Sequence, residues 1–311
     1  LTDEGKIITG ATYLRPKEME SLLLHVANLY EKSGSKVEGD VLSIKPKPAK
    51  KVGISDSIPA EIMELLIENF DIDYGGVGFE PKFPMPDAIE LALLRYRKTK
   101  DKDLLKFVTM TLDGIIGTLN KPVSGLLDNA EGGFFRYSVS RDWSLPHYEK
   151  LLETNAALLV NYLHAYSITG NEKYRTAIEK TIDYIKNYLS CPEGGFYGSQ
   201  DADGEDEYYG KPIEERRKME LPYIDKTIYT NLSSLMAAAF LEAYLVLGID
   251  YCRDFALKTI DFLTQKCYDR EKGMFHYYDT EAHVSGLATD NISMMEALLS
   301  CFVITADIKY L

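Results

Sequence analysis

The spacing of apolar residues predicts a mainly helical chain. From Ile58 onward, apolar side chains recur every three or four residues, as in the series Tyr174, Ala177, Ile178, Ile182, Ile185 and Leu189. A period of about 3.6 residues is typical of amphipathic α-helices. The pattern predicts eight long helices and almost no strand after residue 57.

The first part of the chain has a different pattern. Residues 1–14 predict a turn followed by a β-rich strand, and Pro16 opens an amphipathic helix that runs to about Ser33. One strand region and one helix cannot bury a core, so we interpret residues 1–38 as the end of an α/β domain.

A linker composition follows this segment. Residues 39–57 contain Pro46 and Pro48 among lysines, which is typical of a connection between domains. We therefore predict a domain remnant over 1–38, a linker over 39–57 and a helical domain over 58–311.

Two kinds of connection alternate between the predicted helices. Short turns have the sequences RYRKTKDKDLL, AYSITGNEKYR, AYLVLGIDYCR and CFVITADIKYL, and longer loops contain GGVGF, GGFFRY, GGFYGSQDADG and GMFHYYD. This alternation indicates a repeated helical hairpin, which builds a solenoid or an α/α toroid. Long loops on one face favour the toroid, because they would surround its cavity. We expect about four of the six hairpins of such a ring, in a fragment at both ends.

Charge and cysteine content exclude several classes of partner. The 35 basic and 48 acidic side chains give a net charge of -13, the wrong sign for binding nucleic acid or anionic lipid. No apolar run reaches the roughly 20 residues that a bilayer needs, so we expect no membrane contact and a cytoplasmic protein. Cys191, Cys252, Cys267 and Cys301 form no C-x-x-C and no cluster with histidine. We expect buried free thiols, no metal and no cofactor.

The stretch GGVGFEPKF does not fit a phosphate-binding loop. That loop needs G-x-x-x-x-G-K-[ST] between strand and helix, whereas Pro81 replaces the second glycine and Phe83 the hydroxyl residue. The motif therefore does not support a nucleotide kinase. Lys82 is expected to line or rim a cavity, or to pair with an acidic neighbour.

Three stretches, YGGVGFEPKFPMP, GGFFRYSVSRDWSLPHYEKLLETNAAL and GGFYGSQDADGE, resemble in this order the hallmark stretches of the spermatogenesis-associated protein 20 family. LTDEGKIITGATYLRP and YIDKTIYTNLSSLMAAAF resemble two further stretches. The resemblance implies a thioredoxin-like domain joined to an (α/α)6 toroid similar to those of N-acylglucosamine 2-epimerases and six-hairpin glycosidases. It also implies a carbohydrate-like ligand and leaves room for a contact with the missing part of the thioredoxin-like domain.

Several positions depart from the pattern of that family. Ser140 and Thr154 stand where the family tends to keep aspartates, and Asn231, Leu232 and Ser233 replace a Trp-Asn-Gly. The Cys-x-x-Cys of the family is missing, so no redox activity is assigned. If the lost groups perform chemistry in the family, this protein binds without turnover.

His147 is the first candidate for catalysis. It follows Pro146 at an expected helix N-terminus, where backbone N–H groups favour a neutral, proton-accepting imidazole. The related epimerases abstract a proton next to a carbonyl with histidine, so the resemblance gives His147 the role of general base, with Glu149 as its titratable partner. The alternative is that His147 and Glu149 cap the helix and fix the loop.

Other side chains are candidates for binding. Arg136 and Tyr137 follow a glycine pair, so an arginine fork could hold a carboxylate, phosphate or sugar hydroxyl, or instead brace neighbouring loops. Trp143 would stack on a sugar ring or wedge between helices. The remaining candidates for substrate binding, beside Lys82, are Phe79, Asn155, Asp225 and Lys226.

The acidic loop DADGEDE offers a third possibility for catalysis. Asp201 and Asp203 would serve as a proton-shuttling pair, or only brace a solvated turn. Calcium is disfavoured because Gly204 is fourth in the loop, whereas a calcium loop has its glycine sixth.

Two hypotheses of function remain open on the sequence. The first is an isomerase, epimerase or hydrolase acting on a sugar, and the second is a non-catalytic binding or scaffold module that works with a thioredoxin-like domain. Convergence of His147 and the Asp201 loop on one cavity would favour the first. Side chains consumed by hydrogen bonds within their own loops would favour the second.

Overall fold

The structure is a computed structural model that describes residues 2, 6–10, 14, 16–33, 55–118, 124–202 and 207–311. The chain divides into two compact units, Leu1–Ser55 and Asp56–Leu311, each considered by itself. In the first unit, helix α1 (Pro16–Ser33) begins at the predicted proline, whose fixed φ suits the first position of a helix. Residues 6–10 and 14 of the predicted strand region are described, and among them only Ile7 has a bridge partner. Most of the predicted linker lies outside the described residues. Assignment of this unit to a thioredoxin-like domain therefore stays a prediction.

The prediction of a mainly helical second unit is confirmed. Its described part contains eight helices of eleven residues or more, with one short helix, α7, between them. The long helices are α2 (Ile58–Glu68), α3 (Pro86–Thr99), α4 (Lys102–Ile116), α5 (Leu152–Thr169), α6 (Glu172–Tyr184, continued as a π turn over Ile185–Leu189), α8 (Thr230–Leu247), α9 (Asp250–Lys266) and α10 (Ala288–Thr305). Helix α7 spans Ile213–Arg216 and a 3-10 turn, η3, spans Ile308–Tyr310.

Tight turns join these helices into hairpins. The residue after α3, α5, α8 and α10 has a left-handed conformation, with φ of 58°, 64°, 70° and 54° at Lys100, Gly170, Gly248 and Ala306. Such a residue ends a helix and lets its last carbonyls find partners. At the turns after α3 and α5, Asp101 and Asn171 accept the backbone N–H two residues on and so begin the next helix.

The helices form two layers. Helices α3, α5, α8 and α10 pack one against the next, and α4, α6 and α9 pack on α3, α5 and α8 respectively. The core lies between the layers and is rich in Leu, Ile, Phe and Tyr. By length and composition α8 could cross a bilayer, and half of that span is buried. Its packing against α5, α9 and α10 accounts for its apolar sequence.

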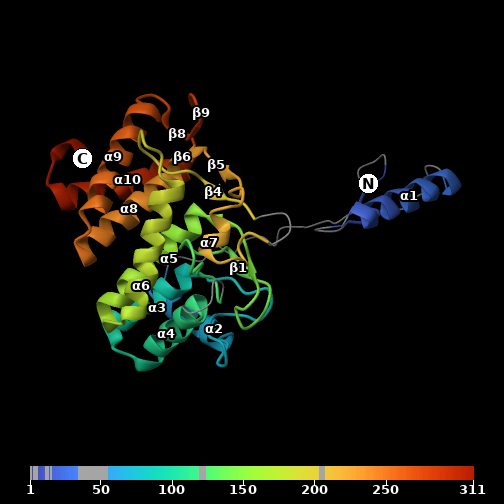
Figure 1. The fold of residues 1–311 in the computed structure, drawn as a ribbon, viewed down its shortest axis with the longest axis horizontal. Helices are drawn as coiled ribbons and strands as arrows, with labels where there is room; N and C mark the ends of the chain where they lie inside the picture. Colours follow the sequence, from blue (N-terminus) through green and yellow to red (C-terminus); the bar gives the residue numbers. More distant parts are fainter. Residues whose placement is uncertain are drawn as a thin grey trace. The chain divides into compact units, whose positions relative to one another are not determined.

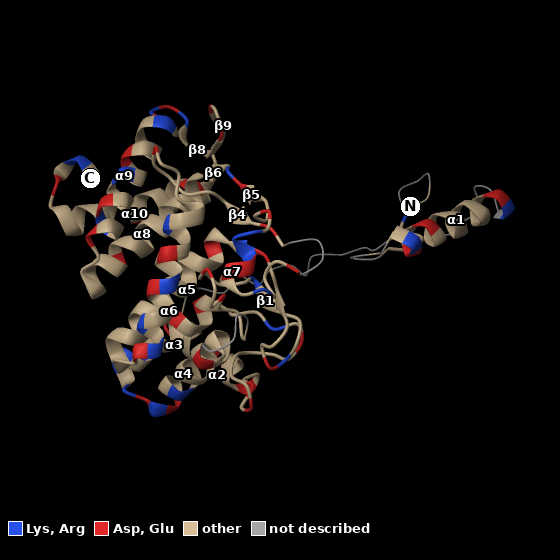
Figure 2. Cartoon of the chain, viewed as in Figure 1, with Lys and Arg blue, Asp and Glu red and all other residues tan. Residues whose placement is uncertain are grey.

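Short strands lie in the long loops, where the sequence predicts almost none. β1 (Tyr137–Ser138) pairs with β2 (Pro146–His147), and β3 (Lys150–Leu151), β4 (Ser199–Gln200) and β5 (Ile224–Asp225) form a second sheet. The third sheet contains β6 (Ile228–Tyr229), β7 (Tyr268–Asp269), β8 (Gly273–Tyr278) and β9 (Ala282–Ser285). The labelled strands lie along one side of the unit, at one end of the helices (Figure 1). Acidic and basic residues are interspersed along the helices and loops of this unit (Figure 2).

Candidate functional site

The long loops of the second unit form one face of that unit, here called the long-loop face. It consists of residues 69–85, 124–151, 190–202, 207–229 and 267–287, which precede helices α3, α5, α8 and α10. Because these four helices lie side by side and each begins after a long loop, the loops meet at the same end of the helical layer (Figure 1).

The structure corrects the expected position of His147. This residue lies in strand β2, and helix α5 begins five residues later, at Leu152. The extended segment is held by pairing of His147 with Tyr137 and of Lys150 with Gln200. Neither the expected effect of helix N–H groups on His147 nor the capping alternative applies, because the residue is not at a helix terminus.

Three rings of the long-loop face form a stack. The Tyr137 ring lies between Phe83, at 4.7 Å and 23°, and His147, at 4.9 Å and 15°. Phe83 is 44% exposed and the His147 side chain 39% exposed. His147 Nδ1 is nevertheless buried without a hydrogen bond, 3.5 Å from Glu149 Oε2. The stack is therefore partly exposed to solvent, and no hydrogen bond to Nδ1 fixes the orientation of its imidazole ring.

An ion pair lies beside this stack. Arg136 Nη1 donates to Glu149 Oε2 at 2.8 Å, and the Arg136 backbone N–H donates to the Glu149 carbonyl at 2.9 Å. Arg136 is 46% exposed. The structure thus brings together four of the predicted residues, Arg136, Tyr137, His147 and Glu149.

The predicted binding residues Lys82 and Trp143 are buried instead. Lys82 Nζ donates to Asp71 Oδ2 at 2.6 Å and to the Arg141 carbonyl at 3.0 Å, so it pairs with an acidic neighbour. Trp143 is 1% exposed, and its Nε1 donates to the Tyr74 carbonyl at 3.0 Å. Its indole therefore has no free face for a sugar.

Asp71 holds this part of the face together. Arg141 donates to both of its carboxylate oxygens at 2.8 Å. Burial alone would raise the pKa of Asp71, but its hydrogen bonds with Arg141 and Lys82 outweigh burial and hold it well below the usual range. The guanidinium of Arg141 also lies 4.9 Å from the exposed ring of Phe79, another predicted binding residue.

Asn155 and Asp225 have bonds within the structure. The buried Asn155 side chain accepts from Phe134 N at 2.7 Å and donates to the Phe134 carbonyl at 3.0 Å. Asp225 lies in β5, and its carboxylate accepts from Thr227 N and from the Tyr229 hydroxyl. Asn155 therefore fixes the backbone at Phe134, and Asp225 fixes the turn before β6.

The acidic loop is only partly described. Asp201 is exposed, its carboxylate accepts from Ala202 N, and its backbone carbonyl accepts from the Tyr209 hydroxyl. Asp203 lies outside the described residues. Lys226 is exposed at a hollow of about 470 Å³ formed with residues 221–224. The roles predicted for these three residues stay predictions.

Sequence reasoning missed a buried ionic network beneath the face. Asp128 Oδ2 accepts from Lys150 Nζ at 2.7 Å and from Arg216 Nη1 at 2.6 Å, and Arg216 also reaches Glu131 at 3.0 Å. Burial lowers the pKa of Lys150, while Asp128 opposes that shift. Burial would raise the pKa of Asp128, yet Lys150 and Arg216 outweigh it and lower this pKa. The network ties together two long loops.

Two histidines outside the predicted set, His164 and His276, have carboxylate partners that are distant in the sequence. His164 on α5 lies with Nδ1 2.9 Å from Glu90 on α3 and Nε2 3.3 Å from Glu242 on α8. Hydrogen bonds that the His164 ring donates to the carboxylates of Glu242 and Glu90 raise the pKa of His164 to about 9. His276 on β8 lies 3.1 Å from the buried Asp290. Their neighbours are 14 to 78 residues away in sequence, so no local motif signals either contact.

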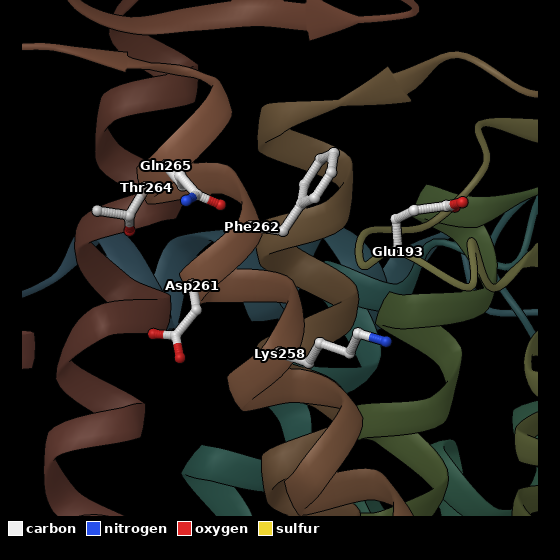
Figure 3. A pocket seen from close by; sticks show the side chains of 6 residues that line it. All are labelled: Glu193, Lys258, Asp261, Phe262, Thr264 and Gln265. Carbon is white, nitrogen blue, oxygen red and sulfur yellow. The ribbon is translucent and has the colours of Figure 1, made fainter.

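A hollow of about 430 Å³ lies beside the outer helix α9 (Figure 3). Its lining side chains are Glu193, Lys258, Asp261, Phe262, Thr264 and Gln265. Figure 3 shows Asp261 and Lys258 pointing in different directions. Lys258 Nζ donates a hydrogen bond to the Pro192 carbonyl. The polar groups do not converge, so this hollow is not a candidate site.

Among the described residues, no cluster of three or more His, Cys, Asp or Glu side chains could hold a metal ion. The four cysteines are free and buried, as predicted.

Comparison with known proteins reveals homologues over part of the chain. No family model matches. Spermatogenesis-associated protein 20 of Mus musculus is 36% identical over 152 residues, which are 48% of this chain and 19% of that protein. The predicted resemblance is confirmed. The human protein is 35% identical over the same length, and an uncharacterized Caenorhabditis elegans protein, B0495.5, is 29% identical over 222 residues, 65% of this chain and 29% of its own length. The chain thus aligns with only a small part of these relatives.

Solved structures with the same fold act on carbohydrates. Cellobiose 2-epimerase from Spirochaeta thermophila has a TM-score of 0.62 at 16% identity, covering 81% of this chain and 65% of its own. A family 76 glycoside hydrolase from Bacteroides thetaiotaomicron has a TM-score of 0.59 at 15% identity, covering 82% and 51%. D-mannose isomerase has a TM-score of 0.56 at 12% identity, covering 79% and 65%. At these identities the likeness shows the α/α toroid fold, while function depends on the site.

Proposed function

We propose that this protein binds a carbohydrate-like small molecule at its long-loop face and acts on it as an isomerase, epimerase or hydrolase. The observation that carries the proposal is the solvent-reaching stack of Phe83, Tyr137 and His147 beside the Arg136–Glu149 pair. The fold neighbours, which are named as sugar epimerases, isomerases and glycosidases, support the choice of ligand class.

The chemistry of the stack suits a sugar. Ligand sites combine apolar or aromatic surfaces with a few fixed polar groups, and a pyranose has an apolar C–H face with hydroxyls at its edge. The exposed rings offer the apolar surface. Arg136 can donate hydrogen bonds to the ligand and Glu149 can accept them, and the ion pair between the two side chains holds both in place. His147 adds an imidazole, which can donate or accept a hydrogen bond.

The proposal is tested by ligand binding to the full chain. D-mannose, D-glucose, N-acetyl-D-glucosamine, cellobiose and sugar phosphates are titrated by thermal shift and isothermal calorimetry. A ligand at about 100 times its Kd stabilises the folded state by about 2.7 kcal/mol, a readily measured shift in Tm. Tyr137→Ala should weaken binding at least tenfold, because it removes the middle ring of the stack.

A matched control shows whether loss of binding is specific to the stack or follows removal of any exposed aromatic ring. Tyr268 lies in β7, is also exposed, and is not part of the stack. Tyr268→Ala should bind as the wild type does. Equal binding by Tyr137→Ala and wild type would place the ligand elsewhere, and the absence of stabilisation by any sugar or sugar phosphate would refute the carbohydrate proposal.

A further inference from the structure

Helices α5, α8 and α10 correspond to one another position by position. Each has 18 residues and is followed by a residue with a left-handed backbone conformation. Positions in the three helices can therefore be compared by counting from the first residue of each. The fifth, eighth and twelfth residues lie on one side of a helix, because they are three and four residues apart.

This side is buried in α5 and α8 but exposed in α10. In the first two helices its six members are at most 3% exposed, and they are Ala156, Leu159, Leu163, Ser234, Ala237 and Leu241. In α10 the equivalent residues are Ile292, Met295 and Leu299, which are 55%, 61% and 53% exposed. These three residues are here called the open side of α10.

The contacts of α8 show what such a side is for. The Ser234 hydroxyl of α8 donates to the sulfur of Met294 in α10 at 3.6 Å, so this side of α8 faces the next helix of its layer. Helix α5 packs on α8 in the same layer. Because α10 corresponds to α8, its open side is placed to contact one more helix in the same way.

A hollow extends the open side of α10. It has a volume of about 420 Å³ and lies between α9, α10 and the turn η3. Its apolar lining includes Met274, Met294, Met295, Leu298 and Leu311. The charged groups of its lining, Asp261 and Lys309, are paired with each other at 3.1 Å. Met295 belongs to both surfaces, so the open side and the hollow form one continuous apolar surface.

This surface is unlike the end of a helical repeat. In repeat proteins each unit packs on its neighbours, and a terminal unit has a polar outer face. Helix α10 contains no lysine or arginine, and its two acidic residues are the buried Asp290 and Glu296. The open side therefore has the composition of a contact between repeats and not that of a polar cap.

We propose that the open side of α10 binds a further helical hairpin of the same repeat. One helix of this hairpin begins at the long-loop face and packs on Ile292, Met295 and Leu299, and the other occupies the hollow. A second copy of the chain is a poorer fit, because a two-fold axis through this contact would set two α10 helices antiparallel. Helices α5, α8 and α10 instead all begin at the long-loop face. The inference goes beyond the proposed function, since it concerns a protein partner and not the ligand.

The repeat also predicts the chemistry of the partner helix. In α10 the residues on the side of Met294, which faces α8, include the buried Ala297 and Cys301. The equivalent residues of α8 are Met236, Ala239 and Ala243, which are also buried. The partner helix should therefore have an apolar side chain followed three and seven residues later by small ones.

The probe is a synthetic peptide of residues 228–266, which contains α8 and α9 and has the required pattern. The peptide carries fluorescein and is titrated with the full chain by fluorescence anisotropy. We expect saturable binding to the wild type. Leu299→Glu should weaken binding by about tenfold or more, because it places a charge in an apolar contact. Leu245→Glu is the matched control, since Leu245 of α8 is 57% exposed outside the open side, and it should bind as the wild type does.

A second variant tests the same contact by protection. Met295→Cys introduces an accessible thiol beside four buried native cysteines. Peptide at about 10 times its Kd should slow maleimide labelling at this position about tenfold, because only the unbound fraction reacts. Light scattering after size-exclusion chromatography should show that the chain alone is a monomer.

Each outcome decides the proposal. Absence of peptide binding, equal binding by Leu299→Glu and wild type, or unprotected labelling at position 295 would each refute it. A dimer that Leu299→Glu dissociates would assign the open side to a second copy and overturn the hairpin as its occupant.

Discussion

Arg216 should be among the most sensitive positions for stability, although it lies in the four-residue helix α7. Its fully buried guanidinium donates to Asp128 and Glu131, and to the backbone carbonyls of Tyr209 and Lys211 at 2.6 and 2.9 Å. Replacement by Met keeps a chain of similar length but removes every one of these bonds. The Arg216→Met substitution therefore tests how much the ionic network contributes to the stability of the long-loop face.

The magnitude follows from what remains after the change. Breaking a buried ion pair by removing one partner costs about 3–5 kcal/mol. Asp128 keeps Lys150 at 2.7 Å, and Glu131 keeps the hydroxyls of Tyr188 and Tyr208. Because these partners remain, we expect Arg216→Met to lower the free energy of unfolding by about 3 kcal/mol, the low end of that range. That is a large fraction of the 5–15 kcal/mol that is typical of a folded protein.

The next residue supplies the control. Arg217 is 67% exposed and pairs with the exposed Glu214, an arrangement worth about 0–1 kcal/mol. Free energies of unfolding of wild type, Arg216→Met and Arg217→Met are measured by urea denaturation monitored by circular dichroism. If the two variants lose stability within about 1 kcal/mol of each other, the network does not hold the loops as argued.

Three further predictions concern other parts of the second unit. The pKa of His164 is raised to about 9, so its contribution to the free energy of unfolding, measured against His164→Gln, should be complete below about pH 6.5, decline above it and vanish beyond about pH 9; a pH-independent difference would contradict this. Gly75→Ala should destabilise much more than Gly170→Ala in thermal denaturation: both glycines have positive φ, but only at Gly75 would the Cβ lie 2.4 Å from a backbone oxygen of α4, and similar losses would refute that clash. Asn155→Leu should cost about 1–3 kcal/mol in urea denaturation, because it orphans a buried backbone N–H, and unchanged stability would mean that the loop finds other partners.

Much of the helical architecture could be predicted because helices depend on local bonds. The N–H to carbonyl bonds of a helix join residues four apart, so the period of apolar residues alone predicts the eight helices and their order. The turn residues Gly170 and Gly248 adopt the left-handed conformation in which glycine is favourable. The alternation of short turns and long glycine-aromatic loops likewise predicts a face on which the loops gather.

The predicted environments of individual side chains succeeded only in part. The sequence brought Arg136, Tyr137, His147 and Glu149 into one candidate set, and the structure places them together. It misplaced His147 at a helix start, because the segment before α5 is extended by pairing with strands that precede and follow it. A local pattern does not contain such pairing.

Residue type and periodicity by themselves determined the mainly helical class, the hairpin repeat and the short list of polar residues on the long loops. Tertiary structure alone decided which of those residues stay accessible. Lys82 and Arg216 are neutralised by carboxylates 11 and 88 residues away in sequence, and His276 is oriented by Asp290 from the next helix. The physical reason is that burial and pairing of a charge depend on what the fold brings within about 4 Å of it, and long-range packing sets those neighbours.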